Sequence, residues 1–236
     1  MRRTQTARPE EENPACFAAP SFRAPHSSPP PPFPAPSPSR RATTASSSSL
    51  RYRGGEGLLI KLFSYDCPFC YKYDVAVDPE LWERIRETGL RFAPWHIEAR
   101  GKYGRAASEF LAWCELLDGA SGRSVTDADS LYKKAKDAWY KAYNRQARRW
   151  FAGEEAFLKT GEDATGLSHA DFETARKTPE VAALADLWRT GYDTARIQGI
   201  PAYVVHGRFL IMTKSIKSPQ GLADLVIELA SRKERP

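Results

Sequence analysis

The stretch LLIKLFSYDCPFCYKY, residues 58–73, decides how the chain is expected to fold. Residues 58–63 form a short, nearly continuous apolar run, which is typical of a central strand covered on both faces. Cys67 and Cys70 follow with two residues between them, the first of which is Pro68. They lie where the strand pattern changes to a helical one. Such a pair could be a redox couple, two metal ligands or two small buried hydrophobic residues.

A second helix and a second strand are predicted after this stretch. Asp78 is a suitable N-cap and Pro79 suits the first helical position, so a helix is expected to begin there and to end near Gly89. Residues 90–98 are predicted to form the second strand. Pro94 within it indicates a strand that lies at an edge or carries a bulge, because proline cannot donate to a sheet ladder.

The next hundred residues, 102–197, are predicted to be mostly helical. One long helix is expected over about 127–150 and another over about 179–199, from the helical spacing of their apolar residues. The longer helix also carries many lysines and arginines. They fall largely on the side opposite its tryptophans, which indicates a solvated basic face rather than a nucleic-acid-binding surface.

Strand pattern returns near the C-terminus. Residues 202–205 and 208–212 flank His206 and Gly207, which are predicted to form a two-residue hairpin turn. Ser218 is expected to open a last helix, with proline directly after it. The sequence therefore predicts an α/β fold: a small sheet with a helical insertion between its second and third strands.

Composition separates residues 1–55 from the rest of the chain. They hold 11 of the 18 prolines and eight Lys or Arg against three Asp or Glu, so they carry +5 of the net charge of +6. Few apolar residues occur there, and we expect this Pro/Ser-rich tail to be disordered. The nearly neutral remainder argues against nucleic-acid binding. The predicted parts are a tail (1–55), a first sheet part (56–101), a helical insertion (102–197) and a second sheet part (198–236).

The chain contains no clear targeting or membrane segment. No run of about 18 or more apolar residues is present, and the tail lacks the apolar core of about 7 to 15 residues that a secretory signal needs. An organelle transit peptide fits the Arg, Ser and Ala content, but Glu10, Glu11 and Glu12 count against it. A third interpretation is that the start is assigned too far upstream.

The position of the two cysteines favours redox chemistry. A cysteine at a helix N-terminus is stabilised as thiolate by the first backbone N–H groups and by the helix dipole. Cys67 is therefore expected to be exposed and nucleophilic, and Cys70, on the same helical face, to be covered and to resolve the mixed disulfide. Zinc usually has four ligands, and no second such pair exists. Cys114, in an apolar helical pattern, is expected to be a small buried hydrophobic residue.

These features resemble the DsbA family of thiol:disulfide oxidoreductases. The resemblance rests on DCPFCYKY after LLIKLF, with GIPAYVVHGRFLI at residues 199–211, and covers about residues 56–233. The closing LIMTKSIKS is more similar to the DsbL branch. The resemblance implies a thioredoxin-like fold with an inserted helical domain. It also implies a cis peptide bond between Ile200 and Pro201 that faces the cysteines, so that the backbone of Ile200 can pair with a client held as a mixed disulfide.

The chain departs from this family at two positions. Strongly oxidising members often have His where this chain has Phe69, so the couple is expected to be less oxidising. The family usually has an acidic residue where this chain has Lys61. We expect Lys61 to be partly buried and its cation to favour the Cys67 thiolate, and we predict that Lys61→Met raises the pKa of Cys67. Pro68, Phe69 and Lys61 are the predicted modulators of the site.

The sequence thus predicts a thiol:disulfide oxidoreductase that donates a Cys67–Cys70 disulfide to client proteins with free cysteines. It needs no bound cofactor, no metal and no nucleic acid for this exchange. The resemblance implies reoxidation by a membrane quinone reductase of the DsbB or DsbI kind, and a periplasmic location, although no signal is visible. The alternatives are a reductase or isomerase on the same fold, or a non-enzymatic metal-binding or chaperone module.

Overall fold

The computed structural model describes residues 44–46, 52, 54–145 and 150–232. All of them belong to one compact unit that begins at residue 40. Most of the tail that is predicted to be disordered lies outside the described residues.

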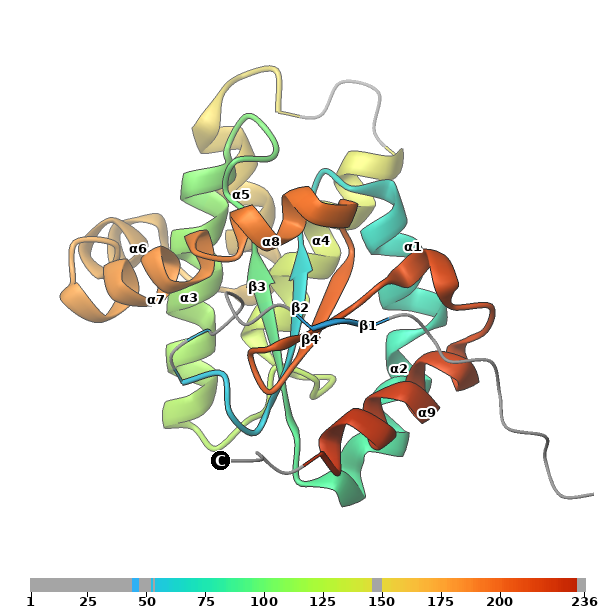
Figure 1. The fold of residues 1–236 in the computed structure, drawn as a ribbon. Helices are drawn as coiled ribbons and strands as arrows, with labels where there is room; N and C mark the ends of the chain where they lie inside the picture. The colour runs from blue at the N-terminus through green and yellow to red at the C-terminus, as the bar shows by residue number, and fades with distance from the viewer. Residues whose placement is uncertain (1–43, 47–51, 53, 146–149, 233–236) are drawn as a thin grey trace, which may run out of the picture. The chain divides into compact units, whose positions relative to one another are not determined.

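A mixed sheet forms the centre of this unit (Figure 1). Its strand order is β1-β5-β4-β2-β3, in which β2 and β3 are parallel and the other neighbours are antiparallel. Among the described strands β3 pairs with β2 alone, so Pro94 lies in an edge strand, as predicted. The strands are β1 (Thr44–Ser46), β2 (Leu58–Phe63), β3 (Arg91–His96), β4 (Ala202–Val205) and β5 (Phe209–Ile211).

The helices follow in the predicted order: one group between the two parallel strands, a long block before the hairpin, and one at the end. The first group is α1 (Pro68–Ala76), α2 (Asp78–Ile85) and the 3-10 turn η1 (Arg86–Thr88). The block is α3 (Gly104–Ala120), α4 (Leu131–Arg145), α5 (Glu154–Thr165), α6 (His169–Ala175), α7 (Pro179–Arg189) and α8 (Tyr192–Gln198). After the hairpin come η2 (Thr213–Ser215) and α9 (Pro219–Ala230). In the described parts of the chain, none of the helices has the length and apolar character that a membrane crossing needs.

Two hydrophobic cores lie on the two faces of the sheet. Successive strand residues point to opposite faces, and β2 is buried throughout. Leu58, Ile60 and Leu62 belong to the core shared with the helical block, whereas Leu59 belongs to the core under α2 and α9. Because neighbouring strand residues point to opposite faces, the Lys61 side chain leaves β2 on the face that α2 covers, opposite to Leu62.

Ordered structure begins before residue 56, which corrects the predicted boundary of the tail. Thr44–Ser46 form β1, which pairs with β5 and so satisfies backbone groups that this strand would otherwise leave at an edge. The Tyr52 N–H donates a hydrogen bond to the Gly207 carbonyl at 3.1 Å. The Tyr52 ring packs edge-on against Trp95, with ring centroids 5.0 Å apart. These contacts join distant segments, so local composition did not reveal them.

The helix after α1 begins at Asp78, but the prediction of Asp78 as its N-cap was wrong. Val77 is the N-cap residue, and no side chain caps this end of α2. The Asp78 carboxylate is buried and instead binds Lys61 and Tyr203. The Asp78 side chain therefore pairs with the buried Lys61 cation instead of capping α2.

The predicted long helix over 127–150 is shorter than expected. α4 begins at Leu131 because Asp118 of α3 caps it, accepting hydrogen bonds from the backbone N–H groups of Leu131 and Tyr132 at 3.0 and 2.9 Å. Trp150 has a left-handed φ of 56° and is not helical. Lys134, Lys141 and Arg145 are exposed and Lys133 is half-buried, so the described part of the predicted basic face is mostly solvated, whereas Lys136 of the same helix is buried.

The predicted helix over 179–199 is divided into α7 and α8. Gly191 lies at the break, where an added Cβ would be 2.7 Å from Leu62 of the sheet. The hairpin also differs, since Val205 pairs with Phe209 and leaves three residues in the turn instead of two.

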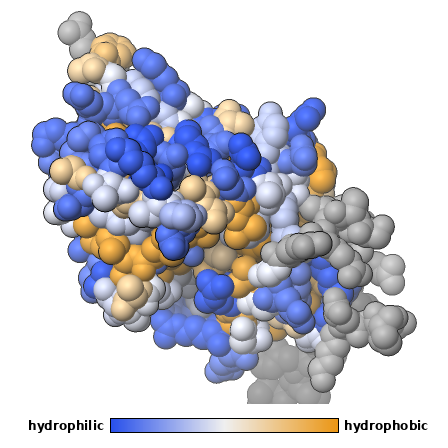
Figure 2. All heavy atoms as spheres, turned by 90° about the vertical axis from the view of Figure 1, so that its left-hand side faces the viewer, coloured by the Kyte–Doolittle hydropathy of each residue, from blue (hydrophilic) through white to orange (hydrophobic). Residues whose placement is uncertain are grey.

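The helical block presents a mixed surface. The face at the left of Figure 1, which carries α6 and α7, is mainly hydrophilic around a band of hydrophobic side chains (Figure 2). Leu187 of α7 is one of the large hydrophobic residues exposed in the structure, at 37%.

Candidate active site

The two neighbouring cysteines lie at the start of α1, where β2 ends. Cys67 is the N-cap residue, with extended backbone (φ −102°, ψ 106°), and Pro68 takes the first helical turn. The backbone N–H of Cys70 donates a hydrogen bond to Cys67 Sγ at 3.1 Å. The sulfur thus occupies the place where a capping side chain accepts from the helix N-terminus, as the sequence predicts. Cys67, Cys70 and Cys114 are free thiols in this structure.

The surroundings of the two thiols shift their pKa values in opposite directions. Hydrogen bonding from Cys70 lowers the pKa of Cys67 from 9.0 to about 7, against the effect of burial, and the nearby Arg100 cation contributes. Burial raises the pKa of Cys70 well above its ordinary value, and the adjacent Cys67 raises it further. At neutral pH, Cys67 is therefore the sulfur with appreciable thiolate character.

Both cysteines are more covered than the sequence predicts. Cys67 is 4% exposed and Cys70 is 0% exposed, so the expectation of an exposed Cys67 was wrong. The loop before β4 accounts for part of the cover, because Cys67 Sγ lies 3.5 Å from the Ile200 carbonyl oxygen, to which it donates. The Ile200–Pro201 peptide bond is cis, as the resemblance implies.

The two residues between the cysteines face solvent. Pro68 is exposed, and the Phe69 side chain is 65% exposed. The ammonium of Lys72 lies 5.5 Å from the centre of the Phe69 ring. The Phe69 side chain has no group that could hydrogen-bond to Cys67, but its backbone N–H contributes to the lowered pKa of that thiol.

Lys61 is fully buried, not partly buried as expected, and belongs to a cluster of four charged side chains. Its ammonium pairs with Asp78 and lies 3.5 Å from Asp74 Oδ1. Asp74 also pairs with Lys136 of α4. We refer to Lys61, Asp74, Asp78 and Lys136 as the buried ionic cluster. Burial disfavours the Lys61 cation, but Asp78 and Asp74 outweigh it and raise the pKa of Lys61.

Lys61 affects Cys70 and not Cys67, for which the sequence predicted its effect. Its cation lowers the pKa of Cys70, which burial has raised. The cation that contributes to the low pKa of Cys67 is Arg100, whose Nε lies 3.8 Å from Asp66 Oδ1. The sequence argument did not identify Arg100 because it follows β3, more than thirty residues from the cysteines.

Other members of the site were also missed. Asp74 follows Cys70 by four residues, a spacing that places both on the buried face of α1, and this signal could have found it. Lys136 comes from the helical insertion, and nothing local to the cysteines points to it. Among the residues that the structure describes, no three His, Cys, Asp or Glu side chains gather in a way that could hold a metal ion.

The chain is similar in sequence to several thiol:disulfide interchange proteins. Thiol:disulfide interchange protein DsbL of Escherichia coli O6:H1 (strain CFT073) is 52% identical over 176 residues, which cover 74% of this chain and 79% of that protein. Thiol:disulfide interchange protein DsbA of Salmonella typhimurium is 24% identical over 170 residues, which are 71% of this chain and 72% of that protein. No protein-family model matches the chain.

Solved structures agree with this similarity. The crystal structure of DsbL from Salmonella enterica serovar Typhimurium has a TM-score of 0.74 and 49% sequence identity, over 78% of this chain and 92% of that chain. DsbA from Proteus mirabilis has a TM-score of 0.59 at 21% identity, over 83% of this chain and 97% of that chain, and supports the fold alone.

The comparisons confirm the predicted thioredoxin-like fold and the predicted disulfide-donating oxidoreductase activity, and nothing in them favours the alternative functions. The chain belongs to the DsbA family of thiol:disulfide oxidoreductases, and within that family to the DsbL branch.

Proposed function

We propose that Cys67 forms the mixed disulfide with client proteins and that Cys70 is the resolving cysteine. The observation that carries this assignment is the hydrogen bond from the Cys70 N–H to Cys67 Sγ at 3.1 Å. It stabilises negative charge on one sulfur only, so Cys67 is the thiolate that reacts at neutral pH in the reduced protein and the sulfur that leaves readily when the mixed disulfide is resolved.

The exchange takes two steps that start from the Cys67–Cys70 disulfide. A client thiolate attacks Cys67 Sγ, the bond between the client and Cys67 forms, and Cys70 leaves as a thiolate and takes up a proton. A second client thiolate then attacks the client sulfur of this mixed disulfide, and Cys67 leaves as a thiolate. The client has lost two electrons, and the protein is left with both thiols reduced.

Ile200 and Pro201 are proposed to hold the client chain during this exchange. The Ile200 carbonyl oxygen lies 3.5 Å from Cys67 Sγ, so a strand-like pairing with Ile200 would bring a client cysteine next to the attacked sulfur. Pro68, Phe69 and Lys61 are proposed modulators: Pro68 permits the N-terminal turn, Phe69 contacts the client and Lys61 acts on Cys70.

Clients and a membrane partner complete the proposed cycle. Proteins of this family act on client proteins and are reoxidised by a membrane partner. We propose that the partner is a quinone reductase of the DsbB or DsbI kind, that no bound cofactor takes part, and that the protein works in the periplasm, where disulfides persist. The chain carries no nucleic-acid-binding role in this proposal.

Single-turnover oxidation of a two-cysteine peptide tests the roles. The oxidised protein is expected to oxidise one equivalent of peptide, and Cys67→Ser and Cys70→Ser are each expected to abolish this. With glutathione disulfide at pH 7, Cys70→Ser should form a mixed disulfide at Cys67, whereas Cys67→Ser should react far more slowly at Cys70. Cys114→Ser is the matched control, because Cys114 is buried in α3. Faster reaction at Cys70 would reverse the assignment.

Equilibration in glutathione buffers sets the direction of the reaction. A potential near the value of about −120 mV known for DsbA is expected for an oxidase. A potential near about −270 mV, as in thioredoxin, would mean a reductase and would contradict the proposal.

A further inference from the structure

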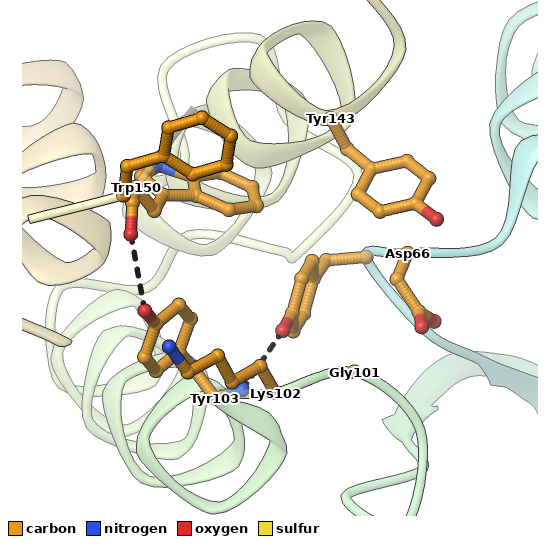
Figure 3. A pocket seen from close by; sticks show the side chains of 8 residues that line it. Asp66, Gly101, Lys102, Tyr103, Tyr143 and Trp150 are labelled. Atoms are coloured by element: carbon orange, nitrogen blue, oxygen red, sulfur yellow. Dashed lines mark hydrogen bonds between the residues drawn. The ribbon is translucent and has the colours of Figure 1, made fainter. Parts of the chain in front are cut away.

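A pocket of about 460 Å³ opens beside the residue that precedes Cys67 (Figure 3). Asp66 and Tyr143 lie on one of its walls, and Tyr103 and Trp150 lie on the other. Tyr65 and Phe151 complete the lining. Its volume lies within the range of roughly 300 to 1,000 Å³ that is typical of small-molecule sites. Since Asp66 is bonded directly to Cys67, a client held at this sulfur has residues within reach of the pocket.

Hydrogen bonds hold the aromatic walls in place. The Tyr103 hydroxyl donates to the Trp150 carbonyl at 3.1 Å, and the Trp150 indole N–H donates to Thr160 at 2.9 Å. The Tyr65 hydroxyl accepts from the Tyr103 N–H at 3.0 Å. Gly101 leaves room for that hydroxyl, because an added Cβ would lie 2.4 Å from it. The pocket is therefore formed before anything binds, which lowers the entropic cost of binding.

Its surface suits an aromatic side chain. The rings of Tyr65 and Trp150 meet edge to face, with their centroids 5.6 Å apart. An aromatic side chain of a client could make the same kind of edge-to-face contact with either ring. Phe151 is 77% exposed at the rim.

The charges around the pocket limit which side chains it can bind. Asp66 Oδ1 is buried and has no hydrogen-bond donor among the described residues, and Arg100 approaches it only to 3.8 Å. The Asp66 side chain is 15% exposed, so its carboxylate can accept a hydrogen bond from an indole N–H or a phenol O–H in the pocket. A lysine or arginine would meet Lys102, whose ammonium already lies 5.2 Å from the centre of the Tyr103 ring. The cation that an aromatic cage could bind is thus supplied by the chain itself.

We propose that this pocket is a client subsite that receives a Trp or Tyr side chain from a residue close to the reacting cysteine of an unfolded client. The proposal rests on the proposed role of Cys67 and adds the class of client sequence that the protein oxidises fastest. A chain in extended conformation advances about 3.3 Å per residue, so the aromatic residue is expected within about three positions of the cysteine.

The test measures kcat/KM for oxidation of two-cysteine peptides that carry Trp, Tyr, Phe, Leu, Lys, Glu or Gly at each position within three residues of the first cysteine. At one position, Trp and Tyr are expected to raise kcat/KM about tenfold over Gly, which is the effect of burying one large side chain. Tyr is expected to exceed Phe there, because only Tyr can donate to Asp66.

Two variants localise the preference in the pocket. Phe151→Ala is expected to reduce the ratio of kcat/KM between the Trp and Gly peptides at least threefold. Asp66→Ala is expected to bring the Tyr-to-Phe ratio to about one. Ratios within one variant cancel any change in the reactivity of Cys67 itself. Leu187→Ala, an exposed apolar residue of α7 outside the pocket, is the matched control and should retain both ratios.

The outcomes distinguish a failure of the proposed subsite from a failure of the proposed function. Equal oxidation of all peptides, a preference for Lys, or a Trp preference that survives in Phe151→Ala would overturn the subsite and leave the proposed function intact. Failure to oxidise any peptide would contradict the proposed function, and the subsite with it.

Discussion

The two sides of the α1 N-terminus use charge in different ways. Behind Cys70, the buried ionic cluster places two cations and two anions in the interior, with side chains that are at most 6% exposed. In front of Cys67, Arg100 and Asp66 form a looser pair at 3.8 Å, with side chains that are 54% and 15% exposed. One set is closely paired and dry, and the other is open to water.

The difference indicates a division of roles. A buried charge that loses its partner is costly, so removing one member of the cluster is expected to destabilise the fold. Its charges balance, which leaves little net field at the more distant sulfur. Hydrogen bonding from Cys70, first from its thiol and then from its backbone N–H, lowers the pKa of Cys67, and the solvated Arg100 contributes.

Lys61→Met is expected to lower the free energy of unfolding by about 3–5 kcal/mol, because it leaves the Asp78 carboxylate buried without its cation. Urea unfolding at pH 7 measures this. Lys159→Met is the matched control: Lys159 pairs with Asp163 on the surface of α5, where water screens the pair, and its loss should change stability far less. Equal effects of the two substitutions would contradict a structural role for the cluster.

The same Lys61→Met variant tests which sulfur the cluster acts on. The sequence argument predicts a higher pKa for Cys67, whereas the structure predicts a higher pKa for Cys70, since Lys61 lowers the pKa of that thiol. Titration of the two thiols by nuclear magnetic resonance, with labelled cysteine, distinguishes them. A rise confined to Cys67 would restore the sequence interpretation.

His96 is expected to make the interior sensitive to acid. Its ring is buried between Ser64 and Ser108, and burial lowers its pKa from 6.5 to about 3. Below pH 6.5 the unfolded chain binds a proton that the folded chain excludes, so stability falls as the pH drops towards 3. The loss at pH 5 is about 2 kcal/mol. His96→Gln should reduce the difference in stability between pH 7 and pH 5 by that amount, and an unchanged difference would exclude His96 as its source.

Arg100→Met is expected to have the smallest effect. Removing this cation should raise the pKa of Cys67 by less than about one unit, because Arg100 is more than half exposed and water screens its charge. The shift should shrink further in 1 M salt. Arg189→Met, which removes an exposed arginine of α7, is the control. A shift that persists in high salt would mean that Arg100 acts by contact and not by charge.

Local signals predicted the parts of the molecule that local chemistry determines. The apolar run of β2 and the helix N-terminus at Cys67 need only neighbouring residues, and both are present as predicted. The predictions failed where a distant residue decides. Asp118 sets the start of α4, and the close approach of Gly191 to Leu62 divides the helix before β4.

The site shows the same limit. Cys67 and Cys70 were found because both lie within one stretch of four residues, and Ile200–Pro201 was found through the resemblance to a known family. Lys136 and Arg100 were not found, because both are distant in sequence from the residues they meet: Lys136 pairs with Asp74 near the C-terminal end of α1, and Arg100 lies beside Asp66. The full burial of Lys61 likewise depends on carboxylates that its own strand does not contain.

The most direct test of this account is the pH dependence of alkylation of the reduced protein, with the modified cysteine identified by mass spectrometry. The account predicts that Cys67 reacts with a midpoint near pH 7, and that Cys70 and Cys114 stay unmodified until well above pH 9. Modification of Cys70 at or below the pH at which Cys67 reacts would contradict the assignment of the exchanging sulfur.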